Sequence, residues 1–136
     1  MAGYSGTPLQ KKLGIKSGFE IKVLKEPSGY WDWISPLPED VKIRKSTTSQ
    51  SLDFVHLFVK ERKVYEKEVL LHRKMLKPDG MIWISWPKKS SGVASDLDEN
   101  LIRNFALKNG LVDVKVCAVD EVWSGLKLVI PVKMRG

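Results

Sequence analysis

Two nearly uninterrupted apolar runs lie on either side of an amphipathic segment, and this pattern limits the folds that the chain can form. Residues 52–59 (LDFVHLFV) and 81–86 (MIWISW) contain few polar side chains, whereas apolar residues in 61–77 recur with a helical period. Strands that are apolar on both faces are typical of parallel sheets. A strand, a helix and a second parallel strand form a right-handed unit. We therefore predict that the two runs are adjacent, parallel, central strands joined by helix 61–77.

The other segments extend this unit to a larger α/β sheet. Asp96 and Glu99 have the spacing of a capping pair, which predicts that Asp96 begins a second long helix. The further predicted elements are helix 8–13, strands 19–24 and 41–45, and two final strands that meet at a turn at Ser124-Gly125. We predict one domain over residues 1–136, with a mostly parallel sheet, helices on both faces and an antiparallel C-terminal β-hairpin.

Strand 41–45 conflicts with this scheme. Only six residues separate it from strand 52–59, whereas a parallel crossover usually takes about a dozen or more. Strand 41–45 is therefore either an irregular edge element or an element whose following helix has been lost.

Composition excludes several classes of protein. The single cysteine, Cys117, excludes an internal disulfide framework or a cysteine-based metal site within one chain, and no metal site is expected. No apolar run approaches the roughly 18 residues that span a bilayer. Residues 1–6 lack the apolar region of a secretory signal, so we expect a cytoplasmic protein without membrane contact. The 23 Lys and Arg against 16 Asp and Glu give a net charge of +7, which favours anionic partners.

The segment from Leu52 to Ile130 resembles the second half of a class I S-adenosylmethionine-dependent methyltransferase domain. In that family a strand of the form LDFVHLFV precedes a helix that ends MLKPDG, followed by a strand, a helix and a terminal hairpin. More narrowly, GYSGTPLQKKLGIK, WPKKSSG and DVKVCAVDEVWSGLKLVI resemble a family of small bacterial proteins of unknown function with a truncated form of this Rossmann-like fold. The resemblance implies a truncated methyltransferase-like domain, and S-adenosylmethionine as its cofactor, but no established activity.

The same resemblance points to Glu26, Gly29 and Asp53 as the cofactor-binding residues. Methyltransferases of this class place an acidic residue and several glycines after their first strand, because glycine lets the backbone approach the cofactor closely. Glu26 matches the acidic residue, but Gly29 is the only glycine in its loop, and Pro27 lacks an N–H. Asp53 matches the acid that often begins the fourth strand of these enzymes.

The end of the second predicted strand departs from the family. The family normally has an acid there that binds the ribose hydroxyls, whereas this chain has Arg44 and Lys45. Basic side chains cannot accept hydrogen bonds from hydroxyls, and they repel a sulfonium cation. Two interpretations follow: a methyltransferase-like shell that has lost its cofactor, or a methyltransferase that holds it in an unusual way.

The loop 87–92 is the best candidate for a ligand site. It follows a central strand, and ligands of open α/β sheets bind beyond the carboxyl ends of the strands. Its ammonium and hydroxyl groups suit a phosphate or carboxylate, although a solvated basic loop has the same composition. Residues 30–33 (YWDW) are expected to form an aromatic rim nearby, unless Trp31 and Trp33 only cover the core. The candidate ligand-binding residues are Lys88, Lys89, Ser90, Ser91 and Trp31.

Other polar residues favour structural roles. His56, within an apolar strand, is expected to be a hydrogen-bonded core residue, His72 to lie at the surface, and Cys117 to be a small buried apolar residue. Asp120 and Glu121 form either an acid–base pair or a solvated turn. No catalytic residue is assigned.

These observations lead to three functional hypotheses. The first is a non-catalytic or catalytically unassigned module that binds a small anionic ligand or a protein partner. The second is an S-adenosylmethionine-dependent methyltransferase with a degenerate cofactor loop, which would make the protein an enzyme. The third is a basic accessory protein that associates with nucleic acid: no recognition motif accompanies the dispersed basic residues, so any such binding would be weak and non-specific.

Overall fold

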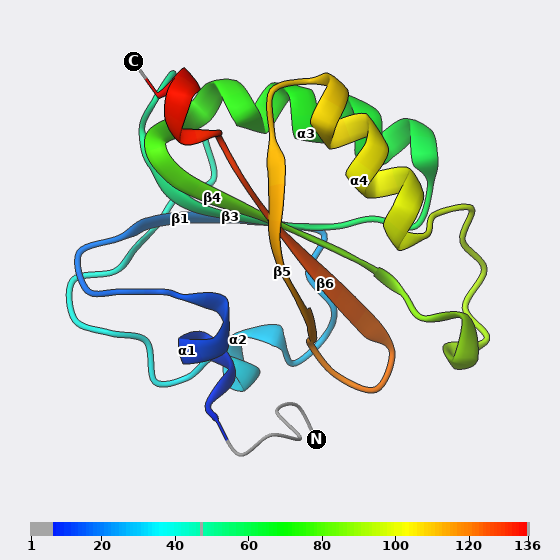
Figure 1. Cartoon of the computed structure of the whole chain (residues 1–136). Helices are drawn as coiled ribbons and strands as arrows, with labels where there is room; N and C mark the ends of the chain where they lie inside the picture. The colour runs from blue at the N-terminus through cyan, green and yellow to red at the C-terminus, as the bar shows by residue number, and fades with distance from the viewer. Residues whose placement is uncertain (1–6, 47, 136) are drawn as a thin grey trace.

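One six-stranded sheet organises the chain, with its strands in the order β2-β1-β3-β4-β6-β5 (Figure 1). The computed structural model describes residues 7–46 and 48–135; residues 1–6, on which the expectation about a signal sequence rests, lie outside this part. The strands are β1 (Glu20–Leu24), β2 (Lys42–Ile43), β3 (Leu52–Phe58), β4 (Leu76–Pro87), β5 (Val112–Ala118) and β6 (Trp123–Val129). The helices are α1 (Leu9–Leu13), α2 (Tyr30–Trp33), α3 (Arg62–Met75) and α4 (Glu99–Lys108), with short 3-10 helices η1 (Lys89–Ser91) and η2 (Val132–Met134).

The central βαβ unit is confirmed. β3 and β4 are adjacent and parallel, with Phe54 opposite Met81 and Leu57 opposite Ile84, and α3 connects them. β1 is also parallel to β3, whereas β4 and β6 are antiparallel, as are β6 and β5. The predicted fold class is therefore correct: a mostly parallel α/β sheet that ends in an antiparallel hairpin.

The turn of that hairpin was predicted too late in the chain. Ser124 and Gly125 lie inside β6, paired with Ala118 and Cys117 of β5. The chain reverses before them, where Asp120 Oδ1 accepts hydrogen bonds from the backbone N–H groups of Val122 and Trp123, at 2.9 and 2.7 Å. A carboxylate that bonds its own following backbone is a strong turn former.

Helices cover both faces of the sheet (Figure 1). α3 and α4 lie on one face, over a core that includes Leu52, Val55, Leu57, Tyr65, Val69, Ile82, Ile84, Ile102, Leu126 and Leu128. The short helices α1 and α2 lie on the other face, over Ile21, Tyr30, Phe54, Phe58, Trp83 and Val119. The indole N–H of Trp83 donates to the Leu13 carbonyl at 2.8 Å, which joins α1 to the centre of the sheet. No helix in the described part of the chain is long and apolar enough to cross a membrane.

The short strand β2 explains the conflict noted in the sequence. β2 has two residues rather than the predicted five, and it is an edge strand that pairs in parallel with β1. β3 lies on the opposite side of β1, so β2 and β3 are not neighbours. The prediction of an edge element is confirmed.

Asp96 caps a different helix from the one predicted. Its Oδ1 accepts a hydrogen bond from the backbone N–H of Arg62 at 2.7 Å, at the start of α3. Asp98 instead begins α4, because its Oδ1 accepts from Leu101 N at 2.8 Å. The spacing of Asp96 and Glu99 therefore suggested the wrong cap. Asp96 lies two residues before Asp98, and its side chain bonds to the neighbouring helix α3 instead of α4.

His72 is buried, contrary to the expectation of a surface position. Its side chain is 1% exposed, and its Nδ1 lies 2.8 Å from the Glu68 carbonyl oxygen. Burial is the main cause that lowers the pKa of His72. His72 lies on the same helix face as Tyr65 and Val69, which are fully buried against the sheet.

Candidate functional site

The strand order places a topological switch point between β1 and β3. The chain passes from β1 to β2 on one side, and then returns to β3 on the other side. Ligands of open α/β sheets bind beyond the carboxyl ends of the strands at such a point. A cavity of about 370 Å³ lies there, which we call the switch-point cavity. Its lining residues are Lys25, Pro27, Phe58, Val59, Lys60, Glu61, Val64 and Trp123.

An unusual backbone turn forms one wall of this cavity. Lys25 directly follows β1 and has a φ of 59°, in the left-handed region that residues other than glycine rarely adopt. Gly29 has a φ of 89° and begins α2. Strained backbone of this kind tends to occur at functional sites. The turn places Lys25 and Pro27 on the lining of the cavity.

Aromatic rings form the inner wall. Phe58 at the end of β3 packs edge-to-face against Trp123 of β6, with ring centroids 5.1 Å apart. Phe58 is 2% exposed and Trp123 is 9% exposed, so both rings are held in the core. Together they form a rigid apolar surface against which a planar ligand group could pack.

Three charged residues line the cavity. Among the described lining residues Lys25 and Lys60 are basic, and Glu61 is the only acidic one. The backbone of Lys60 is fixed, because its carbonyl accepts hydrogen bonds from Ser95 Oγ at 2.7 Å and Asp96 N at 3.3 Å. An ammonium group is a strong partner for phosphate or carboxylate.

Glu26, Gly29 and Trp31 lie beside the cavity without lining it. Glu26 Oε2 accepts a hydrogen bond from the indole N–H of Trp31 at 3.0 Å. The half-buried Trp31 ring packs edge-to-face on Tyr30, with centroids 5.3 Å apart. The structure therefore brings these three predicted residues together in one turn, where Lys25 and not Glu26 faces the cavity.

The loop after β4 is close to the cavity, but two of its polar side chains already form hydrogen bonds within the protein. Lys88 Nζ donates to the Asp120 carbonyl at 2.9 Å, and Ser91 Oγ donates to the Lys88 carbonyl at 2.6 Å. Lys89 and Ser90 are exposed. This loop follows Pro87, which is paired with the lining residue Trp123. None of the four polar loop residues is part of the lining.

Asp53 lies at the opposite end of β3 from the cavity. Its Oδ2 accepts hydrogen bonds from the Glu20 backbone N–H at 2.8 Å and from Lys77 Nζ at 3.2 Å. These contacts join the starts of β1, β3 and β4. The structure thus separates Asp53 from Glu26 and Gly29, with which the resemblance grouped it.

Sequence reasoning missed the residues that immediately follow β3. Lys60, Glu61 and Val64 line the cavity, together with Lys25 after β1. The available signal was their place directly after a buried strand, because the carboxyl ends of parallel strands share one edge of the sheet.

A buried polar network lies behind the cavity. His56 Nδ1 is 2.8 Å from Tyr30 Oη, and His56 Nε2 is 2.7 Å from Ser85 Oγ. All three residues are 0% exposed, so the expected hydrogen-bonded core position of His56 is confirmed. Burial lowers the pKa of His56 to about 3 and raises the pKa of Tyr30. The network supports Phe58, whose ring stacks on His56 with centroids 4.3 Å apart.

No protein-family model and no curated protein sequence matches this chain. Solved structures do match it. An S-adenosylmethionine-dependent methyltransferase from Mesorhizobium loti has a TM-score of 0.64 at 10% identity, and the match covers 93% of this chain and 99% of that one. The DhpI–SAH complex has a TM-score of 0.63 at 12% identity, covering 90% and 82%. A SAM-dependent methyltransferase from Aquifex aeolicus has a TM-score of 0.56 at 13% identity, covering 88% and 86%.

These similarities show the fold, which is that of class I S-adenosylmethionine-dependent methyltransferases. The cofactor that this fold implies carries a sulfonium cation. In the switch-point cavity such a cation would lie among two lysines and one glutamate, so the net charge of the described lining residues is unfavourable for it.

Proposed function

We propose that the protein is a binding module that holds a small anionic ligand in the switch-point cavity. The observation that carries this proposal is a cavity at the switch point of the sheet, whose described lining residues include Lys25 and Lys60 but a single acid, Glu61. The cavity volume of about 370 Å³ is within the range of small-molecule sites. No catalytic step is assigned to these residues.

The lining supports a proposal about the chemical class of the ligand. The apolar walls formed by Phe58, Val64 and Trp123 suit a planar or apolar group. The ammonium groups of Lys25 and Lys60 suit a phosphate or carboxylate at the cavity mouth. A molecule of about nucleotide size that combines both groups satisfies this lining.

The loop after β4 is proposed as a second contact zone for the acidic group. Lys88 Nζ donates to one carbonyl and retains two further N–H donors. Lys89 and Ser90 are exposed beside it. Glu26, Gly29 and Trp31 serve the site indirectly, by holding the turn that carries Lys25.

A methyltransferase is the second candidate function, since the matching solved structures include S-adenosylmethionine-dependent methyltransferases. The two candidates differ in the charge of the ligand that the cavity holds. Glu61 is the residue that separates them, because its carboxylate repels an anionic ligand and attracts a sulfonium cation.

Isothermal titration calorimetry with ADP, S-adenosylmethionine and S-adenosylhomocysteine tests the proposal. We expect ADP to bind, and S-adenosylmethionine to bind more weakly than about 1 mM, or about −4 kcal/mol. Glu61→Gln should tighten ADP binding. Lys60→Ala should weaken it, whereas Lys63→Ala, a matched exposed lysine near the start of α3 that is not in the lining, should leave it unchanged.

Two results would overturn the anion proposal. The first is micromolar binding of S-adenosylmethionine that weakens in Glu61→Gln, which would favour the methyltransferase. The second is equal ADP binding by Lys60→Ala and Lys63→Ala, which would place the anion elsewhere. Lys25→Asn provides a second test of the lining, since asparagine tolerates the left-handed backbone at this position.

A further inference from the structure

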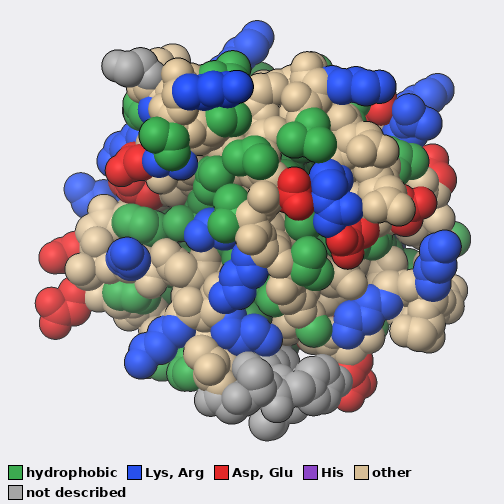
Figure 2. Space-filling model, in the orientation of Figure 1, with side chains coloured by type: hydrophobic (Ala, Val, Ile, Leu, Met, Phe, Trp, Pro, Cys, Tyr) green, Lys and Arg blue, Asp and Glu red, His purple; other side chains and the backbone are tan. Residues whose placement is uncertain are grey.

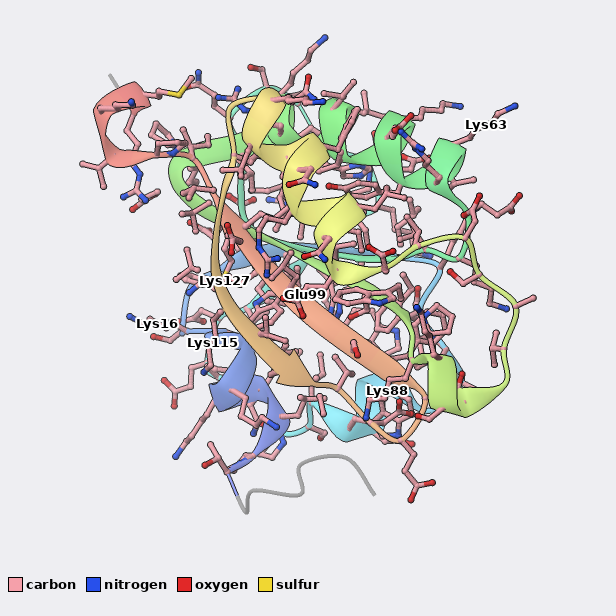
Figure 3. All side chains as sticks on the ribbon, turned by 45° about the vertical axis from the view of Figure 1, so that its right-hand side comes forward. Lys16, Lys63, Lys88, Glu99, Lys115 and Lys127 are labelled. Carbon is pink, nitrogen blue, oxygen red and sulfur yellow. The ribbon has the colours of Figure 1, made fainter. Side chains whose placement is uncertain are left out.

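Four lysines from three separate segments converge on the α1 face of the β5–β6 hairpin. We call Lys12, Lys16, Lys115 and Lys127 the lysine patch. Lys12 belongs to α1 and Lys16 follows it, whereas Lys115 and Lys127 lie on β5 and β6. Figure 3 shows Lys16, Lys115 and Lys127 close together. Figure 2 shows Lys and Arg side chains gathered on the lower central part of this face, with no acidic side chain of the described residues among them.

The two strand lysines are direct cross-strand partners. Lys115 of β5 is paired with Lys127 of β6, so their side chains leave the same face of the sheet from opposed positions. Like charges in directly opposed positions destabilise an antiparallel pair. Lys127 is half-buried, and its pKa is lowered by burial and further by the charges of Lys115 and Lys16. The fold thus carries an unfavourable charge arrangement at this place.

Two of the four ammonium groups of the patch donate to backbone carbonyls. Lys12 Nζ donates to the Ala118 carbonyl at 3.3 Å, and Lys115 Nζ donates to the Lys12 carbonyl at 3.5 Å. Within residues 7–46 and 48–135, none of the four lysines forms an ion pair with a carboxylate. Asp113, the nearest acid in β5, pairs with Arg103 of α4 at 2.9 Å. Within the described part of the chain, the positive charge of the patch therefore has no carboxylate in direct contact.

The residue types of the patch favour one class of anionic macromolecule over another as its partner. Protein–protein interfaces are depleted in lysine and enriched in aromatic residues and arginine, whereas lysines are regular partners of nucleic-acid phosphates. The patch contains no aromatic residue on which a base could stack. Its lysines can contact a phosphate backbone in any sequence.

We infer that the lysine patch binds the phosphate backbone of nucleic acid without sequence preference. This surface is separate from the switch-point cavity, and none of its lysines lines that cavity. A test of the patch can therefore fail without affecting the proposed ligand site. Four phosphate contacts predict a slope of about −3.6 for log K against log salt on duplex DNA.

Fluorescence anisotropy with a labelled short DNA duplex, and with an RNA duplex of equal length, tests this inference. Between about 50 and about 200 mM salt, the wild-type affinity should fall about 150-fold. In the double variant Lys115→Gln/Lys127→Gln it should fall only about 12-fold, because two contacts are lost. This variant should be at least as resistant to urea as the wild type, because it removes the repulsion between the two strand lysines.

The matched control is Lys63→Gln/Lys67→Gln, which removes the same charge from exposed positions on α3, a helix on the opposite face of the sheet from α1 (Figure 1). It should keep the wild-type salt slope. Equal slopes in the two double variants would show that only the net charge matters and would overturn the inference. Polyglutamate that competes as well as unlabelled duplex would also overturn it, in favour of an acidic protein partner.

Discussion

Nε2 of His56 on β3 lies 2.7 Å from Oγ of Ser85 on β4, and both side chains are completely excluded from solvent. On the other side of the ring, Tyr30 Oη lies 2.8 Å from Nδ1. A neutral imidazole has one donor and one acceptor nitrogen, so the two hydroxyl groups satisfy it fully. A protonated ring would bring an unpaired charge into the core, which is why burial lowers the pKa of His56 to about 3.

This lowered pKa predicts that stability depends on pH below neutrality. In the unfolded chain His56 takes up a proton near its ordinary pKa of 6.5, whereas in the folded protein it stays neutral down to about pH 3. Between these values the unfolded state binds more protons, so the free energy of unfolding falls as the pH is lowered. The slope approaches about 1.4 kcal/mol per pH unit for this one group. Urea denaturation at a series of pH values from 7 to 5 measures it.

The variant His56→Phe is the control for this pH dependence. It removes the titrating group, so its free energy of unfolding should change less between pH 7 and 5 than that of the wild type, whatever its absolute stability. A smaller slope remains, because the pKa of the buried His72 is also lowered. An unchanged slope in His56→Phe would contradict the assignment.

Asp96 is predicted to stabilise α3 and not α4. Asp96→Ala removes the acceptor for Arg62 N and should cost about 0.5–2 kcal/mol. The Arg62 amide should then exchange its hydrogen faster, as measured by NMR. Asp98→Ala is the matched variant, and it should instead expose the Leu101 amide at the start of α4. Faster exchange of the Leu101 amide in Asp96→Ala would contradict this assignment and would support Asp96 as the cap of α4, as the sequence suggested.

Gly29 should tolerate alanine less well than Gly18. Both have positive φ angles, 89° and 78°. A Cβ on Gly29 would lie 3.1 Å from Trp33 Nε1, whereas a Cβ on Gly18 has no heavy atom within 4 Å. Both variants carry backbone strain of about 1 kcal/mol or more, and Gly29→Ala adds the displacement of Trp33. Thermal unfolding should give the lower midpoint for Gly29→Ala, and equal midpoints would show that Trp33 moves aside without cost.

The loop after β4 gives a prediction that separates its structural and binding roles. Lys88→Ala should lower stability, because Lys88 Nζ bonds to the Asp120 carbonyl, whereas Lys89→Ala should not. If the loop contacts the ligand's acidic group, phosphate should raise the melting temperature of Lys89→Ala less than that of the wild type. Both proteins must be compared at equal phosphate concentration, since salt exclusion stabilises proteins in general. Equal protection would remove this loop from the site.

The apolar pattern predicted the central strands correctly, and its apolar side of helix 61–77 included Tyr65 and Val69, which are buried. Leu71, counted on the same side, is 46% exposed, whereas His72 is buried. Tyr65 is buried as well, because its hydroxyl donates to the Ile102 carbonyl of α4 at 2.7 Å. Hydrophobicity scales treat tyrosine and histidine as polar, whereas hydrogen-bond partners in the folded chain make their burial favourable. Cys117 is similarly only half-buried, not fully buried as expected.

The site was harder to predict than the fold, for a topological reason. The sequence located the carboxyl ends of the strands, but the position of the switch point depends on strand order. A strand of two residues, β2, decides that order by pairing beside β1. Once β2 is placed there, the residues after β1 and β3 become the site, and Lys25 and Lys60 follow from it. The loop after β4 lies one strand farther along the same edge.

The position of β6 within the sheet has a consequence for folding during synthesis. β6 is made after β5, yet it lies between β4 and β5, and among the described strands it alone pairs with β5. Until residues 123–129 have left the ribosome, β5 has no partner and the apolar edge of β4 stays open to other chains. A nascent or truncated chain that stops between β5 and β6 should therefore depend on chaperones, whereas the seven residues of β6 supply the missing partner strand.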